Sequence, residues 1–398
     1  MAEAPWVTII GLGEDGLDGL SPASRDALAA AEIVMGPTRH LALLGDIAAE
    51  VVEWPVPFAD GLPKLLGRRG RRVVVLASGD PFWFGAGRAI ARSLTPGEWR
   101  AFPGISTFSL VAARLGWPLD QTCCLGLHAA PIQRIRRHLA KGARLIVLLR
   151  DGAAVSDLAA CLETTGFDAS FLHVCEAMGG PRERIRHISV ADARSGDFRH
   201  PVCVAVEVAG GGPALPKTSG LPDNLFKTDG VMTKRAVRAL TLSALAPKPG
   251  EYLWDIGGGS GSIAVEWALA HPSCRVSSIE LRSDRAALIE MNAAAFGVAV
   301  DVVTGGAPEV LDRLDAPDVV FVGGGLDRAL LDDLRARLAP GVRLVANAVT
   351  LETEALLAEA QADLGGDLMR IEVSNITAMG LKRGWKAAYP VVQWSVVL

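Results

Sequence analysis

The sequence predicts an α/β protein of two domains, each built on a sheet with helices between its strands. Short apolar segments alternate with helical stretches along the 398-residue chain. Glycine-rich turns follow several apolar segments, as they do where a strand leads into a helix. The segment 209–222 is rich in glycine and proline and has no periodicity, which indicates a linker. We therefore expect domains at residues 1–208 and 223–398.

In the first domain, apolar segments predict strands that alternate with helices. The expected strands are Trp6–Ile10, Glu32–Met35, Arg72–Leu76, Ala143–Leu149, Ala169–Val174 and Val202–Val208. One helix is expected to begin at Pro22, because Ser21 can cap it and proline suits its first turn. The other expected helices are Ala86–Ser93, Ser106–Leu115 and Ile132–Leu139.

The second domain shows a more regular alternation, with a helix expected between each pair of strands. The expected strands are Glu251–Ile256, Arg275–Glu280, Asp301–Thr304, Asp318–Val322 and Arg343–Ala346. Ile371–Asn375 and Ala387–Val397 are predicted to form a terminal antiparallel pair. Five parallel strands with such a pair predict a Rossmann-like sheet. No repeat relates the two domains.

Composition narrows the possible functions. No run approaches the roughly 20 apolar residues of a membrane span, and the N-terminal residues lack the features of an export signal. The net charge of −4 disfavours nucleic acid as a partner. The six cysteines form no C-x-x-C pair and no zinc-like cluster with histidine, so we expect reduced thiols, no metal and a cytoplasmic location.

The most informative segment is a glycine-rich loop after the strand that ends at Ile256. Its pattern is D-x-G-x-G-x-G, formed by Asp255, Gly257, Gly258, Gly259, Ser260 and Gly261. Dinucleotide folds use G-x-G-x-x-G around a pyrophosphate, beside which an acid fits poorly. Asp255 suits a ligand with an ammonium group and no phosphate, as in S-adenosylmethionine (SAM). An NAD-linked dehydrogenase, or a turn without a ligand, is the alternative.

Other residues of the second domain fit the same ligand. Glu280 ends the next strand, where a carboxylate can accept both ribose hydroxyls. The loop at Gly305–Pro308 is either placed for an adenine edge or an ordinary loop, and Gly323–Gly325 leave room for a bulky, flat acceptor. Lys234 and Arg238 are four residues apart on one helix, where they form either a grip for substrate carboxylates or a solvated basic face.

Several motifs of the second domain together resemble the decarboxylating methyltransferase domain of cobalamin (corrin) biosynthesis. They are Gly220–Phe226, Met232–Leu240, Trp254–Gly261, Gly306–Glu309 and Phe321–Gly325. The resemblance implies SAM contacts at Thr233, Gly257 through Gly261, Glu280 and Ala307. Ala236 departs from the family, which usually has glutamate there.

Two motifs of the first domain, Ala77–Phe82 and Phe102–Thr107, place small residues and free backbone N–H groups at strand ends. Their order and spacing resemble the tetrapyrrole methylase family, a two-lobed α/β fold that binds SAM. Matches to its C5-methylating precorrin branch are Ala31–Gly36, Arg39-His40, Ala112–Gly116, Cys175–Gly179 and Glu183. The resemblance implies SAM contacts at Ser78, Gly79, Asp80, Trp83, Ser106, Thr107 and Leu149.

Two departures concern the acceptor side of this first site. The family's G-x-G-P-G is here Gly11-Leu-Gly-Glu-Asp-Gly16, without the proline. Its Ser-x-His-Gly-Arg is here Gly126-Leu-His128-Ala-Ala, so an arginine that could bind substrate is missing. His128 is therefore a substrate-binding candidate, with a structural role as the alternative.

In this order the two domains resemble the fused precorrin C5,C15-methyltransferases (decarboxylating). The resemblance implies two SAM sites, methylation of a precorrin at C5 and C15, loss of carbon dioxide from the ring C acetate, and self-association. It assigns no catalytic residue. An RNA methyltransferase, which the net negative charge disfavours, and a non-catalytic SAM sensor are the alternatives.

Overall fold

The computed structural model describes residues 5–398 and divides the chain into two compact units. The first unit ends at Pro213, apart from residues 133–137, which group with the second unit; the second begins at Ala214. The division thus falls inside the segment predicted as a linker. Residues 1–4, on which the export prediction partly rests, lie outside the described residues.

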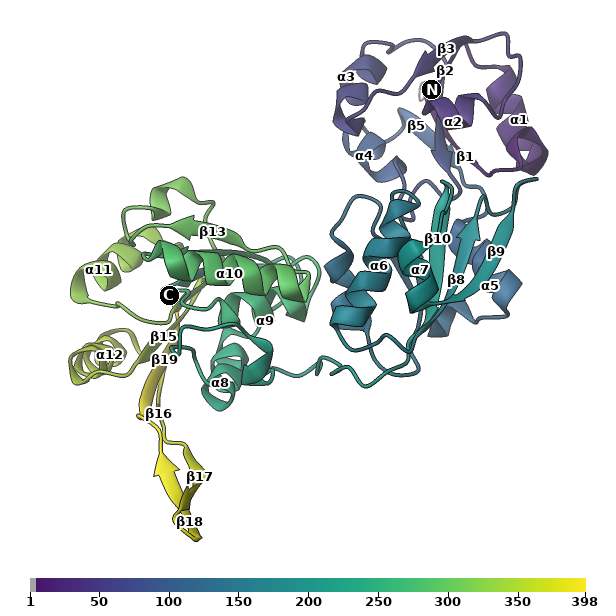
Figure 1. The fold of residues 1–398 in the computed structure, drawn as a ribbon. Helices are drawn as coiled ribbons and strands as arrows, with labels where there is room; N and C mark the ends of the chain where they lie inside the picture. The colour runs from purple at the N-terminus through teal and green to yellow at the C-terminus, as the bar shows by residue number, and fades with distance from the viewer. Residues whose placement is uncertain (1–4) are drawn as a thin grey trace. The chain divides into compact units, whose positions relative to one another are not determined.

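The first unit contains two five-stranded sheets (Figure 1). One is parallel throughout, in the order β3-β2-β4-β1-β5. The other has the order β6-β7-β10-β8-β9, and of its neighbouring strands only β6 and β7 run parallel. The strands are β1 Val7–Leu12, β2 Ile33–Gly36, β3 Glu50–Glu53, β4 Val73–Ser78, β5 Trp99–Phe102, β6 Cys123–Gly126, β7 Arg144–Leu148, β8 Phe171–Glu176, β9 Arg184–Ser189 and β10 Val202–Glu207.

Helices cover both faces of the first sheet because its strands are apolar on both sides. Val7 and Ile9 of β1 pack with residues of α3 and α4, whereas Ile10 and Leu12 pack with residues of α1. The helices before residue 209 are α1 Pro22–Ala29, α2 Thr38–Leu41, α3 Gly61–Leu66, α4 Gly87–Arg92, α5 Thr107–Leu115, α6 Ala153–Thr164 and α7 Val190–Ser195, with 3-10 helices η1 Gly16–Gly19, η2 Phe58–Asp60, η3 Leu119–Gln121 and η4 Ile132–His138. Ser21 caps α1 as predicted: its hydroxyl accepts from the Ser24 amide at 3.1 Å.

Four strands of this unit were not predicted, and all four are the outer strands of their sheets: β3, β5, β6 and β9. An outer strand has one neighbour and less buried surface, so its sequence carries a weak apolar signal. β3, for example, begins and ends with glutamate and is mostly exposed. The helix expected at Ile132–Leu139 is the 3-10 helix η4.

The second unit is built on a seven-stranded sheet in the order β13-β12-β11-β14-β15-β19-β16. Its first five strands are parallel, β19 runs antiparallel to β15, and β16 runs antiparallel to β19, which confirms the predicted Rossmann-like sheet. The strands are β11 Tyr252–Ile256, β12 Arg275–Glu280, β13 Asp301–Thr304, β14 Val319–Val322, β15 Arg343–Ala348, β16 Asp367–Ile371, β17 Ser374–Met379, β18 Lys382–Ala387 and β19 Val391–Val397.

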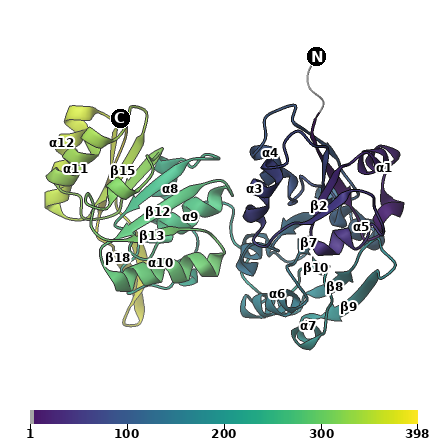
Figure 2. The same cartoon turned by 90° about the horizontal axis from the view of Figure 1, so that it is seen from above.

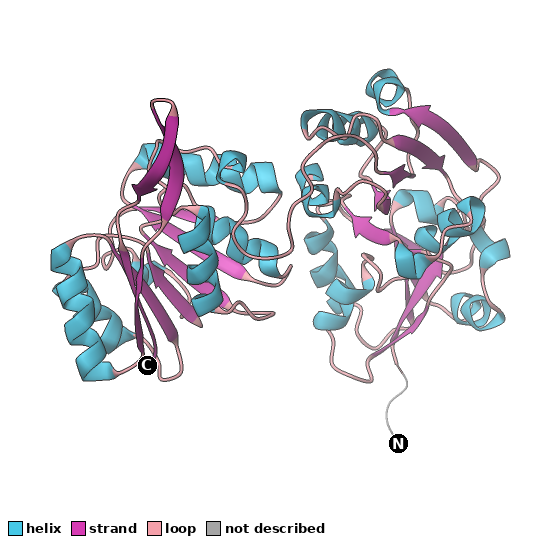
Figure 3. Ribbon diagram, turned by 90° about the horizontal axis from the view of Figure 1, so that it is seen from below, coloured by secondary structure: helices cyan, strands magenta, loops and turns pink. Residues whose placement is uncertain are grey.

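Helices flank both faces of this sheet (Figures 2 and 3). Trp254 of β11 faces a core with α11 and α12, whereas Leu253 faces a core with α8 and α9. The helices are α8 Arg235–Leu245, α9 Ser262–Ala270, α10 Ser283–Phe296, α11 Arg328–Arg337 and α12 Leu351–Leu364, with 3-10 helices η5 Asp223–Leu225 and η6 Leu311–Arg313. None of the helices in residues 5–398 is long and apolar enough to cross a membrane.

Three details of the second unit differ from the predictions. Only η6, and no α-helix, connects β13 to β14. Ile371–Asn375, predicted as one strand, contains the end of β16 and the start of β17, and β17 pairs with β18 in a separate hairpin that projects from the sheet (Figure 1). The last residues of the predicted linker belong to this unit, because Leu221 is buried and Gly220 donates to the Glu266 carboxylate at 2.7 Å.

Candidate functional site

In the second unit the glycine-rich loop turns sharply between β11 and α9. Gly257, Gly259 and Gly261 have φ angles of 76°, 58° and 73°, a left-handed conformation that residues with a side chain avoid. A Cβ at Gly258 would lie 2.1 Å from the Ser278 hydroxyl. Of the five loop residues, three therefore have to be glycine for their left-handed conformation and a fourth, Gly258, for its close approach to β12.

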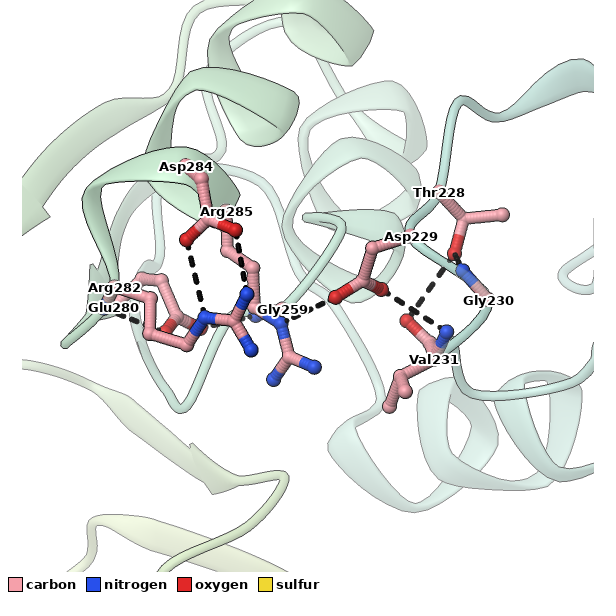
Figure 4. Close-up of polar contacts among 9 residues, drawn as sticks. All are labelled: Thr228, Asp229, Gly230, Val231, Gly259, Glu280, Arg282, Asp284 and Arg285. Carbon is pink, nitrogen blue, oxygen red and sulfur yellow. Dashed lines mark hydrogen bonds and ion pairs between the residues drawn. The ribbon is translucent and has the colours of Figure 1, made fainter.

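Glu280 ends β12, the strand beside β11, and reaches the loop (Figure 4). Its carboxylate accepts from the Gly259 amide at 2.8 Å and from the Arg282 amide at 3.0 Å. The structure thus brings together the loop and the strand-end acid that sequence spacing paired.

Asp255 lies beneath the loop and is 1% exposed. Its carboxylate accepts from the Ser278 hydroxyl at 2.9 Å. Burial raises the pKa of this carboxyl to about 7, despite the hydrogen bond from Ser278, which lowers it. The carboxylate is closed to solvent and joins β11 to Ser278 of β12, and the predicted contact with a ligand ammonium group stays a prediction.

The segment before α8 lies beside the loop and is tied to α10. The Asn292 side chain bonds both backbone groups of Lys227 and also the Ser260 carbonyl, each at 2.8 Å. Asp229 pairs with Arg285 at 2.8 Å (Figure 4). These contacts fix the segment that leads to Thr233, the contact implied by resemblance. Ala307 lies half-buried in the loop after β13.

Arg238 does not have the predicted substrate-facing position. Its side chain is 0% exposed and pairs with Glu266 at 2.5 Å and with Asp223 at 3.1 Å. It also donates to the carbonyls of Thr233 and Leu221. Lys234, by contrast, is the exposed N-cap residue of α8. The two side chains do not form one basic face, because Lys234 precedes the helix while Arg238 lies on its inner side.

In the first unit, a cavity of about 820 Å³ collects the predicted residues. Its lining includes Ser78, Gly79, Asp80, Trp83, Ser106, Thr107, His128 and Leu149. The backbone is tightly packed here: a Cβ at Gly11 would lie 1.9 Å from the Gly79 carbonyl oxygen and 2.3 Å from the Gly104 nitrogen. Glycine at these three strand ends allows the loops to meet.

The lining also contains titratable groups to which sequence reasoning gave no role, among them Glu14, Arg39, His40, Arg150 and His200. Burial, with the charge of Arg39, lowers the pKa of His40 to about 3, so this imidazole is neutral at pH 7. Burial also lowers the pKa of His128. Glu14 lies two residues after β1 and Arg39 three residues after β2, and a charged residue shortly after a buried parallel strand was the available signal. In residues 5–398 no three histidine, cysteine or acidic side chains could hold a metal ion together.

The fold and the two groups of residues define a methyltransferase of two domains. Residues 7–194 match the tetrapyrrole (corrin/porphyrin) methylases, and residues 224–398 match the precorrin methyltransferase domain. The chain is 46% identical to the precorrin-6Y C(5,15)-methyltransferase (decarboxylating) of Sinorhizobium sp, across 98% of this chain and 96% of that protein. This chain therefore belongs to the family of precorrin-6Y C(5,15)-methyltransferases (decarboxylating).

Two further relatives correspond to part of the chain. The cobalt-precorrin-6B C(15)-methyltransferase (decarboxylating) of Salmonella typhimurium is 34% identical across 40% of this chain and 85% of that protein. The solved C-terminal domain of precorrin-6Y C5,15-methyltransferase from Rhodobacter capsulatus is 48% identical, across 46% of this chain and all of that domain, with a TM-score of 0.45.

Proposed function

We propose that this protein methylates a precorrin at C5 and at C15 and removes carbon dioxide from the acetate side chain on ring C, in cobalamin biosynthesis. One observation carries the proposal. A relative whose name states both methylations and the decarboxylation matches nearly the whole chain, including both of its methyltransferase domains.

The first unit methylates C5, and the second unit methylates C15 and decarboxylates. The Salmonella relative supports this division, because its name states only the C15 methylation and decarboxylation and it matches 40% of this chain. The separate matches of the two domains to a tetrapyrrole methylase and to a precorrin methyltransferase agree with it.

Each unit binds its own SAM, in the first unit in the 820 Å³ cavity and in the second on the loop at Gly257–Gly261. The second site fits an adenosyl group, since Glu280 presents a carboxylate for ribose hydroxyls at the end of β12. The Ser260 hydroxyl is buried without a hydrogen-bond partner among the described residues, as expected of a group that serves a ligand. SAM supplies a methyl group on a positively charged sulfur.

The substrate's meso carbons are enamine-like and need no prior deprotonation. The chain's own residues therefore have to bind SAM and the precorrin, align the methyl group with the reacting carbon, and exclude water. In the second unit, Gly324 and Gly325 leave space beside the loop, since a Cβ at either would meet nothing within 4 Å, and exposed Lys234 can hold a peripheral carboxylate. When the acetate loses carbon dioxide, the electron pair of its C–C bond passes into the conjugated ring that C15 methylation leaves cationic. The protein accordingly needs no electron sink of its own.

Two full-chain variants test this division of labour. Glu280→Ala disables the second site, and we expect a product methylated at C5 only and no release of carbon dioxide. Gly79→Val disables the first site, because its added side chain meets the Ile105 carbonyl oxygen, 2.9 Å from a Cβ at this position. We expect this variant to have lost C5 methylation. Carbon dioxide release by Glu280→Ala at the wild-type rate would overturn the assignment.

SAM titration of the wild-type chain tests the two-site proposal, for which the expected stoichiometry is two per chain. A stoichiometry of one SAM per chain would contradict one of the two proposed sites. Tight SAM binding without turnover of the precursor would favour a sensor, and methyl transfer to bulk RNA would favour the RNA methyltransferase alternative. The cytoplasmic location and self-association stay predictions.

A further inference from the structure

The first unit's cavity holds a charged cluster at the carboxyl edge of its parallel sheet. Strands β2, β4 and β1 are neighbours, so the loops that follow them meet at this edge. Glu14 follows β1, Arg39 follows β2, and Ser78 ends β4, and all three line the cavity. The fold therefore brings together residues that are far apart in sequence.

Arg39 is held in place on several sides. Its guanidinium pairs with Glu14, whose side chain is 8% exposed. Its Nη2 donates to the Ser78 hydroxyl at 3.0 Å and lies 2.7 Å from His40 Nε2. The His40 imidazole is neutral, so this contact orients the guanidinium without repelling it. Such orientation lowers the entropy lost when the guanidinium binds an anion.

The charges of the cluster do not balance. Glu14 is shared between Arg39 and Arg182, which lies 3.3 Å away, so two guanidinium groups face one carboxylate. The other arginine of the cavity lining, Arg150, is 69% exposed and already paired with Asp151 at 2.8 Å. Arg39, at 26% exposed, is thus the inner cation that remains available to an anion in the cavity.

We infer that Arg39 binds a peripheral carboxylate of the precorrin in the first unit, taking the place of the arginine that is missing after His128. Glu14, His40 and Ser78 are positioning residues that hold its guanidinium. The inference rests on the proposed function, because it names the residue that anchors the proposed substrate. A precorrin carries acidic side chains around its ring. The Arg39 guanidinium gives three of its five N–H groups to Glu14, His40 and Ser78, so it would hold such a carboxylate by its charge and by a remaining N–H group.

The test measures C5 methylation and SAM binding by the full-length Arg39→Ala variant. We expect KM for the precursor to rise about 10- to 100-fold, equal to about 1.4–2.8 kcal/mol, while the Kd for SAM in the first site changes less than twofold. Arg39→Lys keeps the charge but loses the planar guanidinium, so its KM should lie between those of wild type and Arg39→Ala. Glu14→Gln keeps a side-chain oxygen that can accept from Arg39 but removes the neutralising charge, so KM should fall.

The matched control is Arg114→Ala, which breaks an arginine–glutamate pair with Glu183 (2.7 Å) in the same unit, outside the cavity lining. We expect it to leave KM unchanged. If Arg39 only braced the loops, Arg39→Ala and Glu14→Gln would both weaken precursor binding, and this result would overturn the inference. A rise in the Kd for SAM without a rise in KM would also overturn it, since Arg39 would then serve the SAM carboxylate.

Misfolding of a variant, and failure of the proposed function itself, can both be told apart from these outcomes. If Arg39→Ala does not fold, the opposite effects expected for Arg39→Lys and Glu14→Gln on KM still decide. If wild-type protein does not methylate the precursor, the proposed function fails. If wild type does so and the Arg39 variants keep its KM, only the role of Arg39 fails.

Discussion

Replacing Arg238 by methionine should destabilise the second unit without a direct loss of substrate contacts. The Arg238 side chain is fully buried and joins Glu266, Asp223 and two backbone carbonyls. It also lies 4.9 Å over the Phe226 ring. Methionine fills much of the space but leaves the carboxylate of Glu266 buried without its cationic partner.

Removing one partner of a buried ion pair costs about 3–5 kcal/mol. Glu266 keeps the amides of Gly220 and Leu221, at 2.7 and 2.9 Å, so we expect the lower end, about 3 kcal/mol. Adding Glu266→Gln should recover part of this loss, since glutamine still accepts from an amide but carries no charge to bury.

The assay is urea-dependent hydrogen exchange of the full chain, read from peptides of residues 214–398. The control is Lys234→Ala, at an exposed residue of the same segment, which should change the free energy of unfolding by less than about 0.5 kcal/mol and should raise KM for the precursor in C15 methylation. Wild-type stability of Arg238→Met together with a raised KM would show that Arg238 contacts substrate and would refute the reasoning.

Three further outcomes are expected. Glu280→Gln should weaken SAM binding in the second site about tenfold by loss of a charged hydrogen-bond acceptor, and an equal change in the first site would contradict separate sites. Asp255 should make the free energy of unfolding fall as pH rises from 3.8 to about 7, by up to about 1.4 kcal/mol per pH unit, because the folded state keeps a proton that the unfolded chain has lost. The free energy of unfolding of Asp255→Asn should lack this slope, and an unchanged slope would show that other groups cause it. Gly11→Ala should abolish SAM binding in the first site because its Cβ would meet the Gly79 carbonyl oxygen at 1.9 Å. Gly67→Ala should retain it in a calorimetric titration, because φ is −66° there and a Cβ would make only ordinary contacts, the nearest at 3.5 Å.

The inner strands and the glycine-rich loop were accessible from sequence because their signals are local. Inner parallel strands are apolar on both faces, and the loop at Gly257–Gly261 needs glycine wherever its backbone turns left-handed. The outer strands, such as β3, lacked this signal because one side of each has no neighbouring strand. Likewise the hairpin of β17 and β18 buries too little apolar surface to be separated from β16 by pattern alone.

The sequence by itself determined the two-domain α/β organisation, the glycine-rich loop and the acid that follows it on the next strand. Only the tertiary structure decided which charges are available to a ligand. Lys234 and Arg238 look equivalent four residues apart, yet one is exposed and the other is buried against Glu266. Glu14 and Arg39 meet only because β1, β4 and β2 are neighbours in the sheet. Burial and pairing depend on contacts between distant segments, and spacing along the chain does not encode them.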